Sequence, residues 1–290
     1  MHLLKLVIVL FVSCVLSARA EIYSAETVEE INNSIMDSLS TRNAEKALVI
    51  LPLEGFFAEP VDSAFYKIDD DIKPLVEKSF KKIKLSKRRF MNELILTEYQ
   101  QRLSDQMIPD FIKNIQDKKT PIIVVTRNVS GSFNKIPYLE VWAWQYIMKN
   151  GVDLAKSPIG TKQILLNKSR KKQLGSYPTF YKGLLSCNTV EQANSPQSLI
   201  VYLLSQELKW LPDIVYIVDK NEEYIKSIVQ QFKVMRKDIQ VEGFVYLPKA
   251  KTYKDLSNEQ IIKFWDNLVT KLNNADKKEL DKKNEDPYEQ

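Results

Sequence analysis

Short apolar runs alternate along the chain with longer segments in which apolar residues recur at helical spacing. The runs are continuous, which is typical of strands buried on both faces of a parallel sheet. They span residues 47–53, 121–126 and 213–219, and a further strand is expected over residues 240–247. The amphipathic segments between them predict helices. The chain therefore predicts an α/β fold with a doubly wound, Rossmann-like parallel sheet.

A charged stretch over residues 62–118 interrupts this alternation. Its apolar residues recur at helical spacing and predict two or three helices, which we expect to form a cap-like insertion within one domain of residues 21–274. Ser257 and Gln260 have the spacing of a capping box and predict the start of a last helix. Residues 275–290 are charged and nearly free of apolar groups, so we expect a disordered tail.

Residues 1–20 have the features of a secretory signal peptide: a positively charged start, an apolar run from Leu6 to Leu16 and small residues before Glu21. We expect cleavage after Ala20 and a secreted or periplasmic protein. An alternative is a lipid anchor on Cys14, which ends a weak lipobox. No later apolar run approaches the roughly 18 residues needed to span a bilayer, so no transmembrane segment is expected after the leader.

The composition removes several classes of chemistry. The only histidine is His2, inside the predicted leader, so catalytic triads and zinc sites that need an imidazole are excluded. Without the leader, Cys187 is the one cysteine left, and we expect a small buried side chain that forms no intrachain disulfide. The leader carries Lys5 and Arg19 and no acid, so the formal charge of +5 becomes +3. This excess is too small to indicate a nucleic-acid partner.

Ligands of open parallel sheets bind at the carboxyl ends of the strands, so residues 52–55, 126–128 and 219–221 should converge there. The strand that runs into Pro52-Leu53-Glu54-Gly55 resembles the first motif of the haloacid dehalogenase (HAD) superfamily, a strand followed by Asp-x-Asp-Gly-Thr-Leu. Thr126-Arg127 is similar to the second motif, and the strand ending at Asp219 to the fourth. The segment around Ser195 resembles the region of the third-motif lysine. More narrowly, the layout is similar to a family of exported bacterial proteins of unknown function.

The departures from these motifs imply lost chemistry. Pro52 stands where the superfamily has its nucleophilic aspartate, and Glu54 matches the second aspartate with one extra methylene. Ser195 replaces the lysine, and Val218 replaces the first of two paired acids, leaving Asp219. The resemblance implies a vestigial site with the following members: Pro52, Glu54, Thr126 and Asp219. It also implies three candidate phosphate ligands: Thr126, Arg127 and Ser195.

Two functional hypotheses follow from the resemblance. The leading one is a HAD-like pseudoenzyme that serves as a binding or interaction scaffold and needs no cofactor. The alternative is a metal-dependent phosphatase in which Glu54 and Asp219 hold Mg²⁺ and activate water directly. Simpler interpretations remain open, since Pro52 to Gly55 can be a turn that leaves a strand, and Asp219 with Asn221 can cap the following helix.

A basic stretch lies within the predicted insertion. Such residues are most often a solvated helix face, but they also offer a surface for an anionic partner such as a phospholipid or a polysaccharide. The stretch comprises Lys81, Lys82, Lys84, Lys87, Arg88 and Arg89.

Overall fold

The computed structural model describes residues 20–65, 73–133, 135–166, 176–189, 195–248 and 256–274, without the side chains of Ala20, Leu85, Ser86 and Arg89. The predicted signal peptide and the predicted disordered tail lie outside these residues, apart from Ala20. No helix in the described part of the chain has the length and apolar character needed to cross a membrane.

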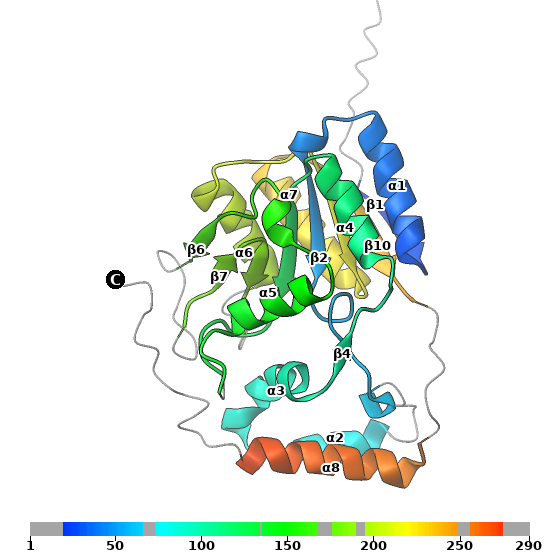
Figure 1. The fold of residues 1–290 in the computed structure, drawn as a ribbon, viewed down its shortest axis with the longest axis vertical. Coiled ribbons are helices and arrows are strands. Elements are labelled where there is room, and N and C mark those ends of the chain that lie inside the picture. Colours follow the sequence, from blue (N-terminus) through cyan, green and yellow to red (C-terminus); the bar gives the residue numbers. More distant parts are fainter. Residues whose placement is uncertain are drawn as a thin grey trace, which may run out of the picture.

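An eight-stranded sheet forms the centre of the molecule (Figure 1). Its strands are β1 (Ala20–Ala25), β2 (Ala47–Pro52), β5 (Ile122–Thr126), β6 (Gln163–Leu165), β7 (Thr179–Tyr181), β8 (Leu184–Ser186), β9 (Ile214–Asp219) and β10 (Gln240–Tyr246). They are ordered β1-β10-β9-β2-β5-β8-β7-β6. The first six in this order run parallel, whereas β7 and β6 pair antiparallel at one edge. The predicted α/β fold with a mostly parallel sheet is confirmed.

Helices cover both faces of this sheet. One face carries α1 (Val28–Ser40), α4 (Ile108–Asp117) and α5 (Leu139–Lys149), and the other carries α6 (Pro196–Tyr202) and α7 (Glu222–Met235). Successive strand residues point to opposite faces, so Val49 and Leu51 join the first core whereas Leu48 and Ile50 join the second. This two-sided burial explains why the central strands are continuously apolar, and the predicted doubly wound arrangement is confirmed.

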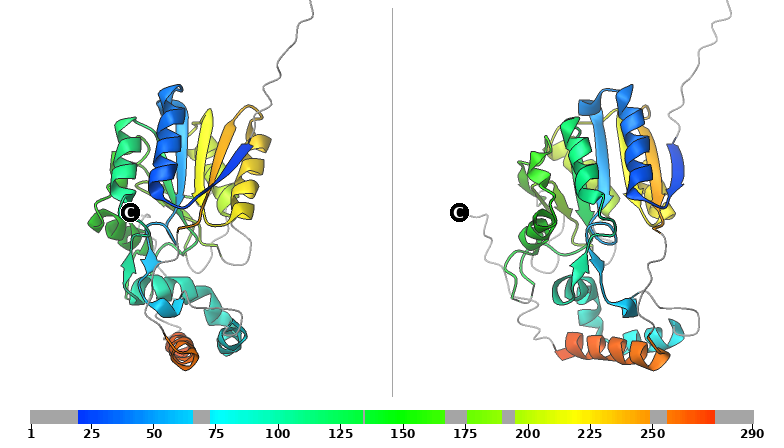
Figure 2. Two further views of the ribbon diagram at one scale, coloured as in Figure 1. Left: turned by 90° about the vertical axis from the view of Figure 1, so that its right-hand side faces the viewer. Right: turned by 45° about the vertical axis from the view of Figure 1, so that its right-hand side comes forward.

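A helical subdomain lies across the carboxyl ends of the strands (Figures 1 and 2). It contains α2 (Lys73–Lys81), the 3₁₀ turn η3 (Leu85–Phe90), α3 (Met91–Glu98) and α8 (Asn258–Asn274). A short ribbon of β3 (Glu59–Pro60) and β4 (Gln101–Arg102) connects it to the sheet. The indole N–H of Trp265 donates to the carbonyl of Ala64 over 3.2 Å at the centre of the subdomain.

The boundaries of this subdomain differ from the expected insertion at residues 62–118. Helix α4 falls inside that range, but its Phe111 and Ile115 are buried in the core beside the sheet. Helix α8 lies far along the chain, yet its Ile261 and Leu268 pack in the subdomain core. The periodicity of each helix is visible in the sequence, but the surface that each apolar face covers is not.

The sequence predicts the start of helix α8 correctly but does not predict strand β1. The capping box at α8 is present, because Ser257 Oγ accepts from the N–H of Gln260 and Gln260 Oε1 accepts from the N–H of Ser257. Strand β1 was not expected, since residues 20–25 directly follow the apolar leader pattern. It pairs in parallel with β10 from Ala20 to Ala25.

We predict that Trp265→Ala loosens the helical subdomain without unfolding the sheet. Loss of a large buried side chain costs about 3–5 kcal/mol, and this cost falls on contacts among α2, α8 and Ala64. Amide hydrogen exchange should therefore accelerate in α2 and α8 but not in β2 and β9. Equal acceleration in both regions would contradict this separation.

Candidate functional site

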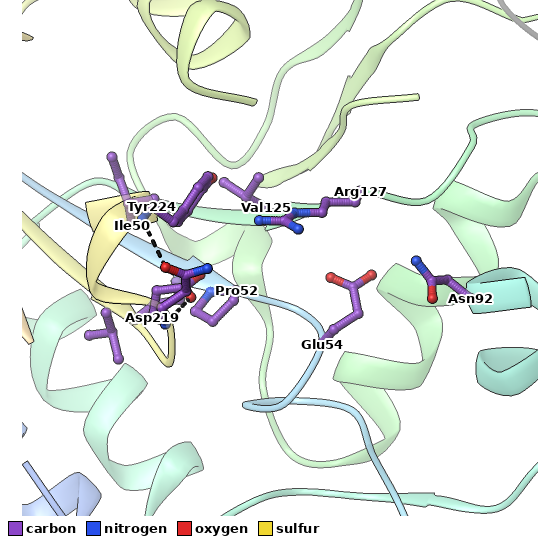
Figure 3. Close-up of a pocket in the computed structure, with 11 residues that line it drawn as sticks. Ile50, Pro52, Glu54, Asn92, Val125, Arg127, Asp219 and Tyr224 are labelled. Atoms are coloured by element: carbon purple, nitrogen blue, oxygen red, sulfur yellow. Dashed lines mark hydrogen bonds between the residues drawn. The ribbon is translucent and has the colours of Figure 1, made fainter. Parts of the chain in front are cut away.

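Three neighbouring strands bring the expected residues to one edge of the sheet. Because β9, β2 and β5 are adjacent and parallel, Asp219, Pro52 and Thr126 end at the same level, as the sequence predicts. A cleft of about 280 Å³ opens there. Its apolar lining includes Ile50, Pro52 and Val125 (Figure 3), together with Val218. Its polar lining residues are Glu54, Asn92, Arg127, Asp219, Asn221 and Tyr224.

A tight turn directs Glu54 into this cleft. The N–H of Leu53 donates to the carbonyl of Val125 at 2.8 Å, and the carbonyl of Leu53 accepts from the N–H groups of Phe57 and Ala58. Gly55 adopts φ +77°, a conformation that favours glycine because it has no Cβ. Proline fits at position 52 because it is the last residue of β2 and lies beyond the last pair of the β2–β9 ladder, Ile50 with Ile217. The turn is therefore an integral part of the site, as well as the exit from a strand.

The carboxyl group of Glu54 is held by the end of β5. It accepts a hydrogen bond from the Thr126 hydroxyl, and the positive charge of Arg127 also acts on it. The Thr126 oxygen in turn accepts from the N–H of Asn128 at 3.1 Å. These are groups that the motif resemblance assigns to phosphate. In the structure a side-chain carboxyl of the same chain engages them.

Burial raises the pKa of Glu54 above its ordinary value of 4.5, although the Thr126 hydroxyl and the Arg127 charge oppose this. Burial also raises the pKa of Asp219 above its ordinary 3.8, against the N–H of Asn221 and the charge of Arg127. For both carboxyl groups, the cost of removing the charged form from water therefore exceeds the stabilisation that the neighbouring donors and cations provide.

Arg127 supplies the positive charge of the cleft. Its guanidinium lies over the ring of Tyr224, 5.3 Å from the centroid, and points along the cleft between Val125 and Glu54 (Figure 3). No carboxylate in the described part of the chain pairs with it at ion-pair distance. Asn92 enters the cleft from α3, so the helical subdomain contributes directly to the lining. The guanidinium can therefore form a bidentate pair with a carboxylate or a phosphate.

Asp219 combines the two roles that the sequence left open. It lines the cleft, and its Oδ1 accepts from the N–H of Asn221 at 2.8 Å. Asn221 itself caps α7 by accepting from the N–H of Tyr224 at 3.1 Å. Val218 is buried in the core beside the sheet. The first of the two paired acids of the fourth motif therefore has no substitute at this strand end.

Ser195 and Cys187 stand apart from this chemistry. Ser195 caps α6, where its Oγ accepts from the N–H of Ser198 at 3.2 Å, and it is not a lining residue of the cleft. The structure thus does not bring Ser195 together with Thr126 and Arg127. Cys187 is a free, fully buried thiol in the core between the sheet, α6 and α7. Burial raises its pKa, so it behaves as the small apolar side chain that the sequence predicts.

The polar groups of the cleft do not suit Mg²⁺. Within the described ranges, no three His, Cys, Asp or Glu side chains are grouped as a metal site. Mg²⁺ prefers six oxygen ligands in near-octahedral geometry. Here Glu54 is engaged by the end of β5, and the Arg127 cation lies near both carboxyl groups.

Two cleft residues were missed by sequence reasoning. Tyr224 lies in the first turn of the helix that follows β9, so the motif position could have indicated it. Asn92 carries no such signal, because its place depends on how the subdomain docks. That docking rests partly on Glu93, whose carboxyl accepts from the N–H of Val129 at 3.1 Å, and on the packing of Phe90 against Phe133.

Much of the basic stretch serves the subdomain itself. Lys82 pairs with Asp266 at 2.7 Å, and the buried Lys87 donates to the carbonyl of Asn273 at 2.8 Å. Lys81, Lys82, Lys84 and Arg88 are exposed, although Lys82 is paired with Asp266, and the side chain of Arg89 lies outside the described residues. The surface is therefore less charged than the sequence alone indicates.

The sheet order, the two helix layers and the cleft at the strand ends define an α/β protein, consistent with the HAD-like fold expected from the motifs. The chain belongs to the family described as "Protein of unknown function (DUF2608)", because a model of that family matches residues 24–278.

Relatives occur in Rickettsia. The chain is 28% identical to an uncharacterised protein of Rickettsia bellii over 249 residues, covering 84% of this chain and 83% of the relative. It is 25% identical to one of Rickettsia conorii over 297 residues, covering 98% and 97%. Among solved structures, the HAD domain of effector protein Lem4 from Legionella pneumophila gives a TM-score of 0.34 at 12% identity, covering 78% of this chain and 96% of that one. The strand order and the two helix layers define the fold of this chain.

We predict that Gly55→Ala destabilises the protein by about 1–2 kcal/mol, because an L-residue is strained at positive φ. The added methyl would also lie 3.2 Å from Cε of Lys220, whose flexible side chain can give way. Chemical denaturation should show the loss both in this variant and in Gly55→Ala combined with Lys220→Ala. Full recovery in the double variant would mean that contact with Lys220, and not backbone conformation, sets the cost.

We predict that Glu54→Gln changes how stability depends on pH. A raised folded-state pKa means that the wild-type protein loses stability as pH rises from about 4.5, the unfolded value, through the folded value. Glutamine keeps an oxygen for Thr126 but does not titrate. The free energy of unfolding of the variant, relative to wild type, should therefore increase from pH 4 to pH 7 in denaturation experiments. A decrease over this range would show that the carboxylate is net stabilised.

Proposed function

We propose that this protein is a HAD-like pseudoenzyme that binds a small anionic ligand in the cleft and does not turn it over. The observation that carries the proposal is the composition of the cleft: Pro52 occupies the end of β2, while the Arg127 guanidinium faces the open space. A proline ring offers neither a nucleophile nor a metal ligand. An arginine held over an aromatic ring is suited to recognition of carboxylate or phosphate.

The helical subdomain serves as the cover of this binding site. Asn92 extends from α3 into the cleft, so a bound ligand would contact both the sheet and the subdomain. Asn92, Asn221 and Tyr224 offer neutral polar groups around the charged centre. Such an arrangement favours a ligand with one anionic group and several hydrogen-bonding groups.

The alternative is a metal-dependent phosphatase that uses Glu54 and Asp219. Its support is that both carboxyl groups line the same cleft. It requires Glu54 to leave the Thr126 hydroxyl in order to bind a metal. That rearrangement exchanges an existing hydrogen bond for metal ligation beside a cation, so we favour the binding protein.

Export and a surface partner are further parts of the proposal. The pattern of residues 1–20 supports secretion or periplasmic location with cleavage after Ala20, with a lipid anchor on Cys14 as the alternative. An anionic partner of the subdomain would meet Lys81, Lys84 and Arg88, since Lys82 and Lys87 are engaged internally.

We predict that p-nitrophenyl phosphate binds to the cleft without hydrolysis. Calorimetry should detect binding that weakens about ten- to a hundredfold in Arg127→Gln, the range expected for a hydrogen bond between charged groups. Arg42→Gln, which removes an arginine outside the cleft lining, should bind as wild type. Release of nitrophenolate in the presence of Mg²⁺ should not exceed that of buffer.

Turnover above background that disappears in Asp219→Ala would overturn this proposal and establish the phosphatase. Binding that is equal in wild type and Arg127→Gln would remove the cleft as the ligand site. Circular dichroism of each variant confirms that the fold is intact before binding is compared.

A further inference from the structure

A second cavity lies at the opposite end of the sheet, where the chain enters β2 and β5. Its volume is about 440 Å³, within the range of roughly 300–1,000 Å³ typical of ligand pockets. Its wall is mostly apolar, and two lysines stand at it. Its apolar lining includes Pro121, Ile159, Leu208 and Trp210, and its two lysines are Lys119 and Lys162.

The backbone around this cavity is unusual. Among the described residues, four other than glycine have positive φ, and two of them, Lys119 at 58° and Lys209 at 50°, lie on the loops that line it. A third, Lys182 at 48°, donates its N–H to the carbonyl of the lining residue Lys162 at 2.9 Å. Such conformations cost about 1 kcal/mol or more each and concentrate at functional sites.

A π-helical turn over Leu203–Glu207 sets the position of the aromatic wall. The N–H of Leu208 donates to the carbonyl of Leu203 at 2.8 Å, and the N–H of Trp210 donates to that of Leu204 at 3.0 Å. These bonds hold Leu208 and Trp210 on either side of the strained Lys209. Single π turns are rare and occur often at functional sites, so two independent backbone features coincide here.

Positive side chains outnumber negative ones in the lining of this cavity, with Lys119 and Lys162 against Glu45. Lys119 lies 3.9 Å from a carboxylate oxygen of Glu45, and both side chains are largely exposed, so the pair contributes little to stability. Lys162 is exposed and has no ion-pair partner in the described part of the chain. Two ammonium groups therefore face one carboxylate beside an apolar wall. The complementary ligand has an apolar body and one negative group.

We propose that this cavity is a second ligand site, which binds an amphipathic monoanion such as a medium-chain carboxylate. The apolar body packs on Trp210, Leu208 and Ile159, and the acid group lies toward Lys119 and Lys162. The site is separate from the cleft at the carboxyl ends of the strands and does not depend on the function proposed for that cleft.

The test compares three ten-carbon probes that differ only in the terminal group: decanoate, decanol and decylammonium. Each is titrated into the full chain while tryptophan fluorescence is followed, and Trp210→Phe identifies the part of the signal that comes from this site. Decanoate should bind about tenfold more tightly than decanol, the effect of roughly 1.4 kcal/mol of charge attraction. Decylammonium should bind more weakly than decanol.

Variants locate the binding. Lys119→Gln and Lys162→Gln should each weaken decanoate binding about three- to tenfold and leave decanol unchanged, whereas Leu208→Ala should weaken both. Lys156→Gln removes an exposed lysine outside the lining and serves as the matched control. The proposal fails if decylammonium binds as tightly as decanoate, if both lysine variants bind decanoate as wild type, or if folded protein shows no saturable binding of decanoate.

Discussion

The contact between Glu54 and the end of β5 is the interaction on which the candidate site depends. It joins the turn after β2 to Thr126 and so links the ends of two central strands. The same contact uses a hydrogen-bond donor that the motif resemblance reserves for a phosphate. A carboxyl of the protein thus occupies a donor that the resemblance assigns to phosphate, and the proposed function leaves recognition of an anion to the guanidinium of Arg127.

This constraint links the fold to the proposed function. Strand order places β9, β2 and β5 side by side, which brings Asp219, Pro52 and Thr126 to one edge. The helical subdomain covers that edge and adds Asn92, because Glu93 and Phe90 hold it against the loop after β5. Proline at the end of β2 supplies no side-chain nucleophile at this strand end, which supports the binding function proposed for the cleft. The separate cavity at the other end of the sheet uses loops that the cleft does not.

The sequence predicts the elements that a local hydrophobic pattern determines. It does not predict which distant segments pack against one another. The central strands could be recognised because burial on both faces leaves a continuous apolar run, as at Ile122–Thr126. The convergence of Pro52, Thr126 and Asp219 follows from the parallel sheet alone. By contrast, the association of α8 with α2 and the entry of Asn92 into the cleft depend on contacts between distant segments. Ser195 has the right place in the motif order, but its hydroxyl caps a helix.

The protonation of Glu54 is the sharpest test of its contact with the end of β5. Carbon-13 NMR of labelled glutamate carboxyl groups, with the Glu54 signal assigned by its absence from Glu54→Gln, gives the pKa of this group in the folded protein. We expect a pKa above the ordinary 4.5, together with a change at the Thr126 resonances over the same pH range. A carboxyl that titrates at or below 4.5, with no response at Thr126, would show that it is solvated and not enclosed at the end of β5, and would contradict the central claim.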